Sequence, residues 1–293
     1  MSTNYRIEKD FLGEKQIPAD AYYGVQTQRG KDNFHITGTP MSSEPYFVMA
    51  FGYVKKAAAM ANRDLGVLDG RVADAIIAAC DRLIAGEMRD QFITDFIQGG
   101  AGTSTNMNAN EVIANLALEQ LGHEKGEYQY VNPNDHVNFG QSTNDVYPTA
   151  FRLSLILRLS SYMEALRKLQ SAFFAKGKEF ERVLKMGRTH LQDAVPMSLG
   201  QEFHGWGTTI GEEVERIAEV RQFLHEINLG ATAIGTRVTA APGYPELATK
   251  HLSELTDCKF ILGSDLVDLS QYRLALYANG KPISESPTNS LAL

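Results

Sequence analysis

The chain has 293 residues, enough for one large domain or two ordinary ones, and its 43% hydrophobic and 22% charged residues are typical of a soluble globular protein. Asp and Glu total 35 against 28 Lys and Arg, a formal charge of -7, which argues against nucleic acid or an anionic membrane as the main partner. The two distant cysteines, Cys80 and Cys258, predict a reduced protein. With no signal peptide or long apolar stretch visible, we expect a cytoplasmic location.

The first half of the chain alternates turn-rich and helical stretches. Residues 1–43 are predicted as an extended or turn-rich arm, because Gly and Pro recur along them. Apolar residues at helical spacing then predict helices over 45–65, 72–84 and 108–121, each followed closely by a glycine. Ser43 is the expected N-cap of the first of these helices.

The second half carries two long apolar stripes. Steps of three and four over 149–176 and 198–229 predict helices of about 30 residues each. Helices of that length need partners, either within a bundle or across subunits. Strands and helices do not alternate, which argues against a parallel α/β sheet. Residues 271–293 are turn-rich and lack a stripe, so they are either a disordered tail or sequence foreign to the preceding fold.

Three segments concentrate hydroxyl, amide and glycine residues directly before apolar helical stretches: 99–108, 141–145 and 187–193. Any one of them is explained by helix capping and turns. Three helix N-termini with added hydroxyl donors would also suit a dicarboxylate, because free N–H groups and the positive end of the helix dipole attract carboxylates. The partial Gly-Ala-Gly at 100–102 lacks a strand-turn-helix context, so it does not predict a nicotinamide site.

Of the seven histidines, His190 is the candidate acid/base group, because it lies in the third polar segment. A lone histidine is more often structural, so the residues alone leave this open. The histidines of the second long helix have no metal-ligand partner four residues on, so zinc is not predicted. Four others are predicted as ordinary surface or turn residues: His35, His123, His136 and His251.

The polar segments also carry a family resemblance. Residues 100–115, 132–145 and 185–196 resemble, in order and at compatible spacing, three signature regions of the fumarase/aspartase superfamily. The resemblance covers about residues 5–268. The Gly-His-Glu-Lys-Gly-Glu-Tyr-Gln-Tyr linker at 122–130 and a Ser-Thr-Asn sequence, where fumarases commonly have Ser-Ser-Asn, favour the aspartase branch, with fumarase as the alternative.

This resemblance implies a carbon-nitrogen lyase that reversibly eliminates ammonia from L-aspartate to give fumarate. No cofactor is implied, although a divalent cation such as Mg²⁺ is expected as an activator, and the family assembles as a homotetramer. Five residues of this chain are implied to bind substrate: Thr103, Ser142 and Thr143 at the β-carboxylate and its aci form, Asn144 at the amino group, and Thr189 at the α-carboxylate. His190 is implied to assist the binding or departure of the amino group.

The implied fold is mostly α. An N-terminal helical lyase domain is expected over 1–141, followed by the start of an incomplete central long-helix bundle over 142–268 and a divergent tail over 269–293. At Arg237 the family usually has glycine, so an arginine there is costly if the backbone needs a positive φ.

One family feature does not occur in the sequence. The general base of the family is the second serine of a Gly-Ser-Ser-x-Met-Pro-x-Lys-x-Asn loop, and no such pattern is present. A frameshift or early stop would explain its absence and the divergent tail, and catalysis by these residues alone is doubtful. Two interpretations follow: an aspartase-like enzyme, or a non-catalytic remnant that associates with a full-length paralogue.

Overall fold

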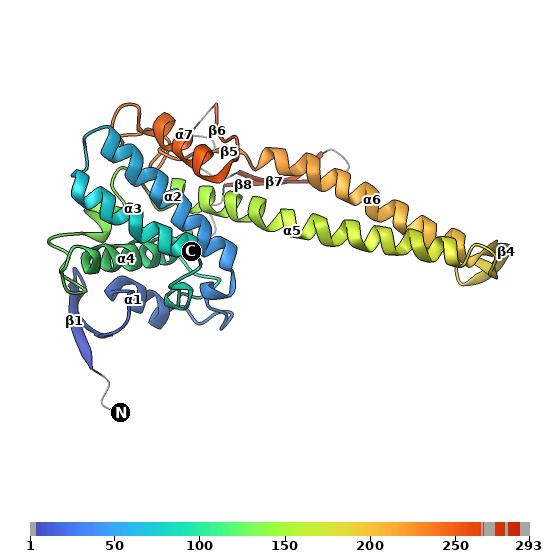
Figure 1. Ribbon diagram of the computed structural model, residues 1–293, viewed down its shortest axis with the longest axis horizontal. Coiled ribbons are helices and arrows are strands. Elements are labelled where there is room, and N and C mark those ends of the chain that lie inside the picture. The colour runs from blue at the N-terminus through green and yellow to red at the C-terminus, as the bar shows by residue number, and fades with distance from the viewer. Residues whose placement is uncertain (1–3, 265, 267–272, 279–280, 288–293) are drawn as a thin grey trace. The chain divides into compact units, whose positions relative to one another are not determined.

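The computed structural model describes residues 4–264, 266, 273–278 and 281–287, which are mostly helical, as predicted (Figure 1). The α-helices are α1 (Val25–Asn33), α2 (Pro45–Asp64), α3 (Gly70–Ile84), α4 (Thr103–Gln120), α5 (Thr143–Glu179), α6 (Leu199–Phe223) and α7 (Tyr244–Thr256). Short helical turns are η1 (Met41–Ser43), η2 (Arg89–Gln91) and η3 (Pro133–Val137). Antiparallel pairs join β1 (Tyr5–Asp10) to β2 (Gly13–Pro18), β3 (Leu184–Thr189) to β4 (Gln192–Ser198), and β7 (Arg273–Ala278) to β8 (Lys281–Pro287).

The chain forms two compact units. The first consists of Met1–Ser154 and His225–Leu293, and the second of Leu155–Leu224. The first unit also contains a short parallel pair, β5 (Glu226–Ile227) with β6 (Ile261–Leu262). Among the described residues, no helix combines the length and apolar character that crossing a membrane requires. The domain boundary expected after residue 141 stays a prediction.

Helix α2 lies at the centre of the first unit, packed against α3 and α7 (Figure 1). Its buried face repeats at steps of three and four, with Phe51, Val54, Ala58 and Ala61 all fully inaccessible to solvent. The alanines allow close approach of neighbouring helices. A Cβ added at Gly52 would lie 3.2 Å from the carbonyl oxygen of Cys80 on α3, so the two backbones are nearly in contact there.

Helix α4 is buried from Thr105 to Leu118 although five of those residues are Asn or Glu. A buried amide is costly unless it is hydrogen-bonded, and all of these side chains except Asn110 bond to other segments. Asn108 Nδ2 donates to the Gln91 carbonyl at 2.9 Å, and Asn115 Nδ2 donates to the Tyr22 carbonyl at 2.8 Å. The polar residues of α4 therefore position the loops around it.

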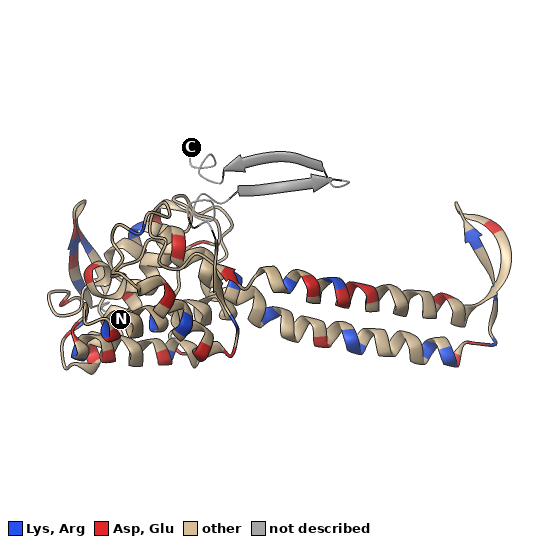
Figure 2. Cartoon of the chain, turned by 90° about the horizontal axis from the view of Figure 1, so that it is seen from above, with Lys and Arg blue, Asp and Glu red and all other residues tan. Residues whose placement is uncertain are grey.

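In the second unit, α6 packs along the later part of α5, and the β3–β4 hairpin joins the two helices (Figure 1). A Ser198–Gln201 capping box starts α6, and the rings of Phe173, Phe203 and Trp206 form the apolar contact. Lys, Arg, Asp and Glu residues occur along both helices (Figure 2). Large apolar side chains are exposed as well, with Phe223 at 74%. Helix α6 ends there, earlier than the predicted residue 229.

The predicted helices form, with differences at their starts. The N-cap of α2 is Glu44, so the prediction of Ser43 was wrong: Ser43 belongs to the preceding turn η1. Helix α4 starts at Thr103 and not near residue 108, because Asn106 and Asn108 donate to other segments and do not form a turn. Helix α1 was missed, since its residues are polar and lack an apolar stripe.

His251 is buried, and the prediction of a surface or turn position was wrong. Its Nε2 lies 2.9 Å from Oδ2 of Asp64, so α7 is joined to the end of α2 by a polar contact. In the predicted tail, the described residues 273–278 and 281–287 form the β7–β8 hairpin. The rest of that tail lies outside the described residues.

Candidate active site

The first polar segment forms a tight turn before α4. Gly100, Ala101 and Gly102 have φ of 76°, 52° and 90°, a left-handed run that favours glycine. A Cβ added at Gly102 would lie 2.7 Å from Cγ of Tyr147, so no side chain fits. Thr103 is exposed at the start of α4, and its Oγ1 donates to the Gly100 carbonyl at 2.6 Å. Its hydroxyl must therefore rotate before it can donate to a ligand.

The second polar segment starts α5 with a reciprocal cap. Ser142 Oγ accepts from the Asn144 N–H at 3.3 Å, and Asp145 Oδ1 accepts from the Ser142 N–H at 2.9 Å. Thr143 Oγ1 accepts from Asn106 Nδ2 at 3.1 Å. Within the described part of the chain, no acceptor takes the hydroxyl hydrogen of Thr143. This hydroxyl is therefore a donor at a helix N-terminus, which suits a carboxylate.

A loop from later in the first unit is held against the start of α5. The buried Asp145 accepts through Oδ2 from the N–H groups of Gly230 at 3.0 Å and Thr232 at 2.9 Å. Asn144 Nδ2 donates to the carbonyl of Ala233 at 2.7 Å. This contact fixes the direction of the Asn144 amide, whose oxygen is the kind of atom that accepts from an amino group.

Further along this loop, Arg237 has a φ of 60°, which confirms that the position usually occupied by glycine needs a left-handed backbone. At such a backbone conformation, a residue with a Cβ destabilises the fold by about 1–2 kcal/mol relative to glycine. Arg237 Nη1 pairs with Glu246 Oε1 at 3.0 Å, but both side chains are largely exposed, so the ion pair contributes little.

A buried lysine lies below these residues. Lys55 on α2 is fully inaccessible, and its Nζ donates to Asn138 Oδ1 at 2.8 Å and to Gln141 Oε1 at 2.9 Å. Burial lowers the pKa of Lys55 and raises the pKa of Asp145, while the attraction between the two charges opposes both shifts. Polar groups buried this deeply are held in fixed orientations by their partners.

The third polar segment forms the turn of the β3–β4 hairpin in the second unit. Thr189 pairs with Gln192, and the two-residue loop consists of His190 and Leu191. Their φ values are 48° and 62°, the pattern of a type I′ turn, which usually contains Asn and Gly. Thr189, His190 and Leu191 are exposed. Strained residues in such a turn are common at functional sites, although strain alone assigns no role.

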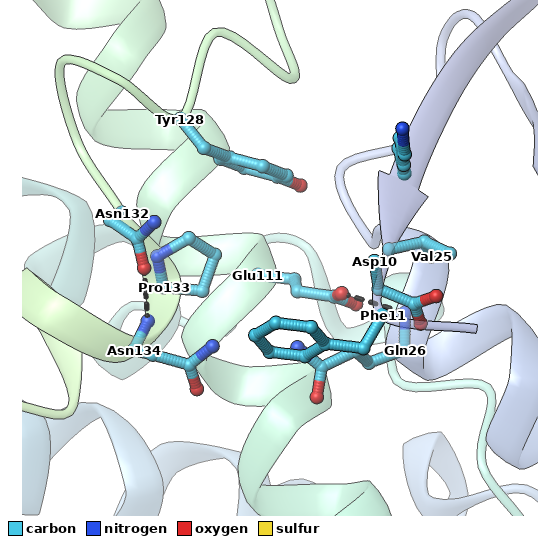
Figure 3. Close-up of a pocket in the computed structure, with 10 residues that line it drawn as sticks. Asp10, Phe11, Val25, Gln26, Glu111, Tyr128, Asn132, Pro133 and Asn134 are labelled. Carbon is cyan, nitrogen blue, oxygen red and sulfur yellow. Dashed lines mark hydrogen bonds between the residues drawn. The ribbon is translucent and has the colours of Figure 1, made fainter. Parts of the chain in front are cut away.

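A separate pocket of about 380 Å³ borders β1, α1 and the segment 128–134 (Figure 3). Its one deeply buried carboxylate is Glu111, which accepts from the N–H groups of Gly24, Gln26 and Thr27 and from the Thr27 hydroxyl. Burial, together with the nearby Glu8 charge, raises the pKa of Glu111 to about 7, although the donors on Thr27 and Gln26 oppose this shift. Because Glu111 caps the start of α1, its role in this pocket is structural.

The structure brings four of the six predicted site residues into the first unit: Thr103, Ser142, Thr143 and Asn144. Thr189 and His190 belong to the second unit. Sequence reasoning missed the polar layer below Thr143, which consists of the buried Lys55, Asn106 and Gln141 and the partly buried Asn138. For Lys55 a signal existed, because residue 55 falls on the apolar face of its helix.

Comparisons with known proteins identify the family of the chain. A family model described as a lyase matches residues 13–271. Aspartate ammonia-lyase of Pseudomonas aeruginosa is 55% identical over 264 residues, which is 90% of this chain and 56% of that protein. Aspartate ammonia-lyase of Escherichia coli strain K12 is 52% identical over 269 residues, 92% of this chain and 56% of that protein. The chain thus spans about 56% of the length of these curated relatives.

Solved structures give the same result. A fumarate lyase:delta crystallin from Brucella melitensis bound to cobalt superposes with a TM-score of 0.88 at 50% identity, covering 91% of this chain and 58% of that one. A class II fumarase from Schistosoma mansoni superposes with a TM-score of 0.80 at 34% identity, covering 96% of this chain and 56% of that one. The match over 13–271 and these superpositions show that the chain belongs to the lyase family, within the fumarase/aspartase superfamily that its polar segments resemble.

Proposed function

We propose that this chain carries the dicarboxylate-binding part of an aspartate ammonia-lyase, which eliminates ammonia from L-aspartate to give fumarate. The observation that carries the proposal is the start of α5, where the Thr143 hydroxyl accepts from Asn106 and keeps its hydrogen for another partner. Ser142, whose hydroxyl oxygen caps α5, is the preceding residue and lies at the positive end of the α5 dipole. The curated relatives named aspartate ammonia-lyase supply the reaction.

The elimination needs hydrogen-bond donors at the β-carboxylate, because negative charge builds up there during the reaction. Removing a Cβ proton beside a carboxylate produces an aci-carboxylate dianion, which fixed hydrogen-bond donors stabilise more than they stabilise the substrate. Ser142 and Thr143 donate there, with Thr103 after its hydroxyl rotates. The amide oxygen of Asn144 accepts a hydrogen bond from the amino group of the substrate. Hydroxyls serve this purpose well because they donate to an oxyanion without being strong acids.

The remaining contacts in this proposal come from the third polar segment. Thr189 binds the α-carboxylate, and His190 assists the binding or departure of the amino group. We propose a cytoplasmic homotetramer in which neighbouring copies complete each site. We further propose that the reaction needs no cofactor and that a divalent cation such as Mg²⁺ acts as an activator.

The general base is a serine in the family's loop, and these 293 residues contain no loop of that pattern. We therefore expect binding of dicarboxylates without appreciable turnover unless another polypeptide supplies the base. The assay follows fumarate absorbance after addition of L-aspartate, with L-malate in a parallel cuvette and with Mg²⁺ present or absent. Fumarate formed from malate but not from aspartate would replace the proposal with a hydratase.

Binding is measured by calorimetric titration of fumarate. Thr143→Val removes the hydroxyl and should weaken binding about tenfold, the loss of one charge-assisted hydrogen bond. Thr143→Ser keeps the hydroxyl and is the matched control, with binding close to that of the unchanged chain. If Thr143→Val and Thr143→Ser bind fumarate equally well, or if the unchanged chain binds none, the proposed site is wrong.

A further inference from the structure

The buried lysine below α5 fixes the direction of two amides. Lys55 Nζ donates to Asn138 Oδ1 and to Gln141 Oε1. A lysine ammonium has three donors and no acceptor, so both amides must turn their oxygens toward it. Asn138 also donates through Nδ2 to the Gln141 carbonyl at 3.3 Å, which holds its amide in the same orientation.

The orientation of the Asn138 amide in turn determines that of the Asn106 amide, which is 1% exposed. Asn138 Oδ1 accepts from Asn106 Nδ2 at 3.2 Å, and the same Nδ2 donates to Thr143 Oγ1 at 3.1 Å. If Asn106 turned over, its oxygen would face the Asn138 oxygen. Two acceptors in contact and largely shielded from water are costly, so Asn106 must present its NH₂ group to Thr143.

The last member of the chain is the Thr143 hydroxyl, which has one hydrogen to donate. Because its oxygen accepts from Asn106, that hydrogen points away from the buried layer. We propose that Lys55 is a positioning residue for Thr143: acting through Asn138 and Asn106, it keeps the Thr143 hydroxyl hydrogen available to the carboxylate of a bound dicarboxylate. The inference rests on the proposed function, in which Thr143 contacts that carboxylate.

Loss of Lys55 has a defined consequence. Without the ammonium, only the 3.3 Å bond to the Gln141 carbonyl still holds the Asn138 amide, so the Asn138 and Asn106 amides can turn over. The Asn106 oxygen would then accept the Thr143 hydrogen, and a bound carboxylate would lose one charge-assisted hydrogen bond. Fumarate should therefore bind about tenfold more weakly, as it does when the hydroxyl itself is removed.

The test is a double-mutant cycle on the dissociation constant of fumarate. Lys55→Met and Thr143→Val should each weaken binding about tenfold, and the double variant should bind no more weakly than Thr143→Val, because no hydroxyl remains to be oriented. Lys56→Met is the matched control. Lys56 is the next residue on α2, and its ammonium pairs with Asp81 at the surface, so binding should not change.

The outcomes separate the inference from the proposed function. If Lys55→Met weakens binding by the same factor with and without the Thr143 hydroxyl, Lys55 has a general structural role and the inference is overturned. If Thr143→Val leaves fumarate binding unchanged, the proposed function fails. Should Lys55→Met not fold, Asn138→Ala breaks the middle link while Gln141 still holds Lys55, and the same non-additivity with Thr143→Val is expected.

A measurement without ligand tests the orientation directly. The side-chain amide resonances of Asn106 in a ¹H–¹⁵N spectrum should move in Lys55→Met and in Asn138→Ala, because both variants remove the group that orients this amide. They should stay in place in Lys56→Met. Unchanged Asn106 resonances in folded Lys55→Met would overturn the inference, whatever the affinity of this variant for fumarate.

Discussion

Gly102 and Gly122 flank the two ends of α4 and make a matched pair for substitution. Both have left-handed backbones, with φ of 90° and 82°, so alanine at either position costs about 1–2 kcal/mol in strain. They differ in space: a Cβ at Gly122 meets nothing within 4 Å, whereas one at Gly102 overlaps the ring of Tyr147. That ring packs edge-on against Phe47 at 5.2 Å between centroids, so it has little room to move. Overpacking costs a further 1–3 kcal/mol, roughly, and Gly102→Ala should lose that much more stability than Gly122→Ala.

Urea denaturation followed by circular dichroism measures the difference in unfolding free energy between the two variants. A second pair of variants isolates the clash. In a Tyr147→Ala background the ring is gone, so Gly102→Ala should cost no more than Gly122→Ala. Equal stability of the two single variants, or an excess cost of Gly102→Ala that persists without the ring, would refute the reasoning. In either case Tyr147 would not be what requires glycine at the start of α4.

Three further predictions concern single residues. Burial alone would raise the pKa of Asp95, but donors on Ile97 and on residues 37–38 lower it to about 2, so its contribution to stability is present above pH ~4 and is lost toward pH 2. Asp95→Asn should therefore lower the melting temperature more at pH 7 than at pH 3. Glu111→Gln replaces one of two accepting oxygens with a donor and should cost about 1–3 kcal/mol in urea denaturation, and an unchanged midpoint would contradict the capping role. Leu191→Gly relieves a φ of 62° without loss of burial, since Leu191 is 93% exposed, and should increase protection of β3 and β4 amides from hydrogen exchange.

The helices could be predicted from the sequence where an apolar stripe marks a buried face. This holds for α2 and α3, whose buried residues follow the three-and-four spacing. The stripes of α5 and α6 also predict helices, although members such as Leu169 and Val220 are exposed. It fails for α1 and for the first turn of α4. Those residues are polar, and local preference assigns them to turns, but tertiary hydrogen bonds satisfy them inside helices.

The candidate site could be predicted only as separate pieces. The Ser142 cap and the polar turns before α4 and α5 follow from residue types at helix starts. The layer below Thr143 could not, because Asn106, Asn138 and Lys55 come from distant segments, and their contacts depend on the packing of α2 against the rest of the first unit. A lysine in an apolar stripe indicates that buried hydrogen-bond acceptors exist, but the sequence does not identify which residues they are.

The first unit is built from two stretches of sequence separated by the whole of the second unit. Asp145 near the start of α5 needs the N–H groups of Gly230 and Thr232, and α2 packs on α7. As the chain leaves the ribosome, the early helices cannot complete their packing until residues that follow α5, β3, β4 and α6 have been synthesised. A nascent chain stalled before residue 230 therefore leaves apolar surface of α2 uncovered for chaperones to bind, and native protease resistance should appear only once α7 has emerged.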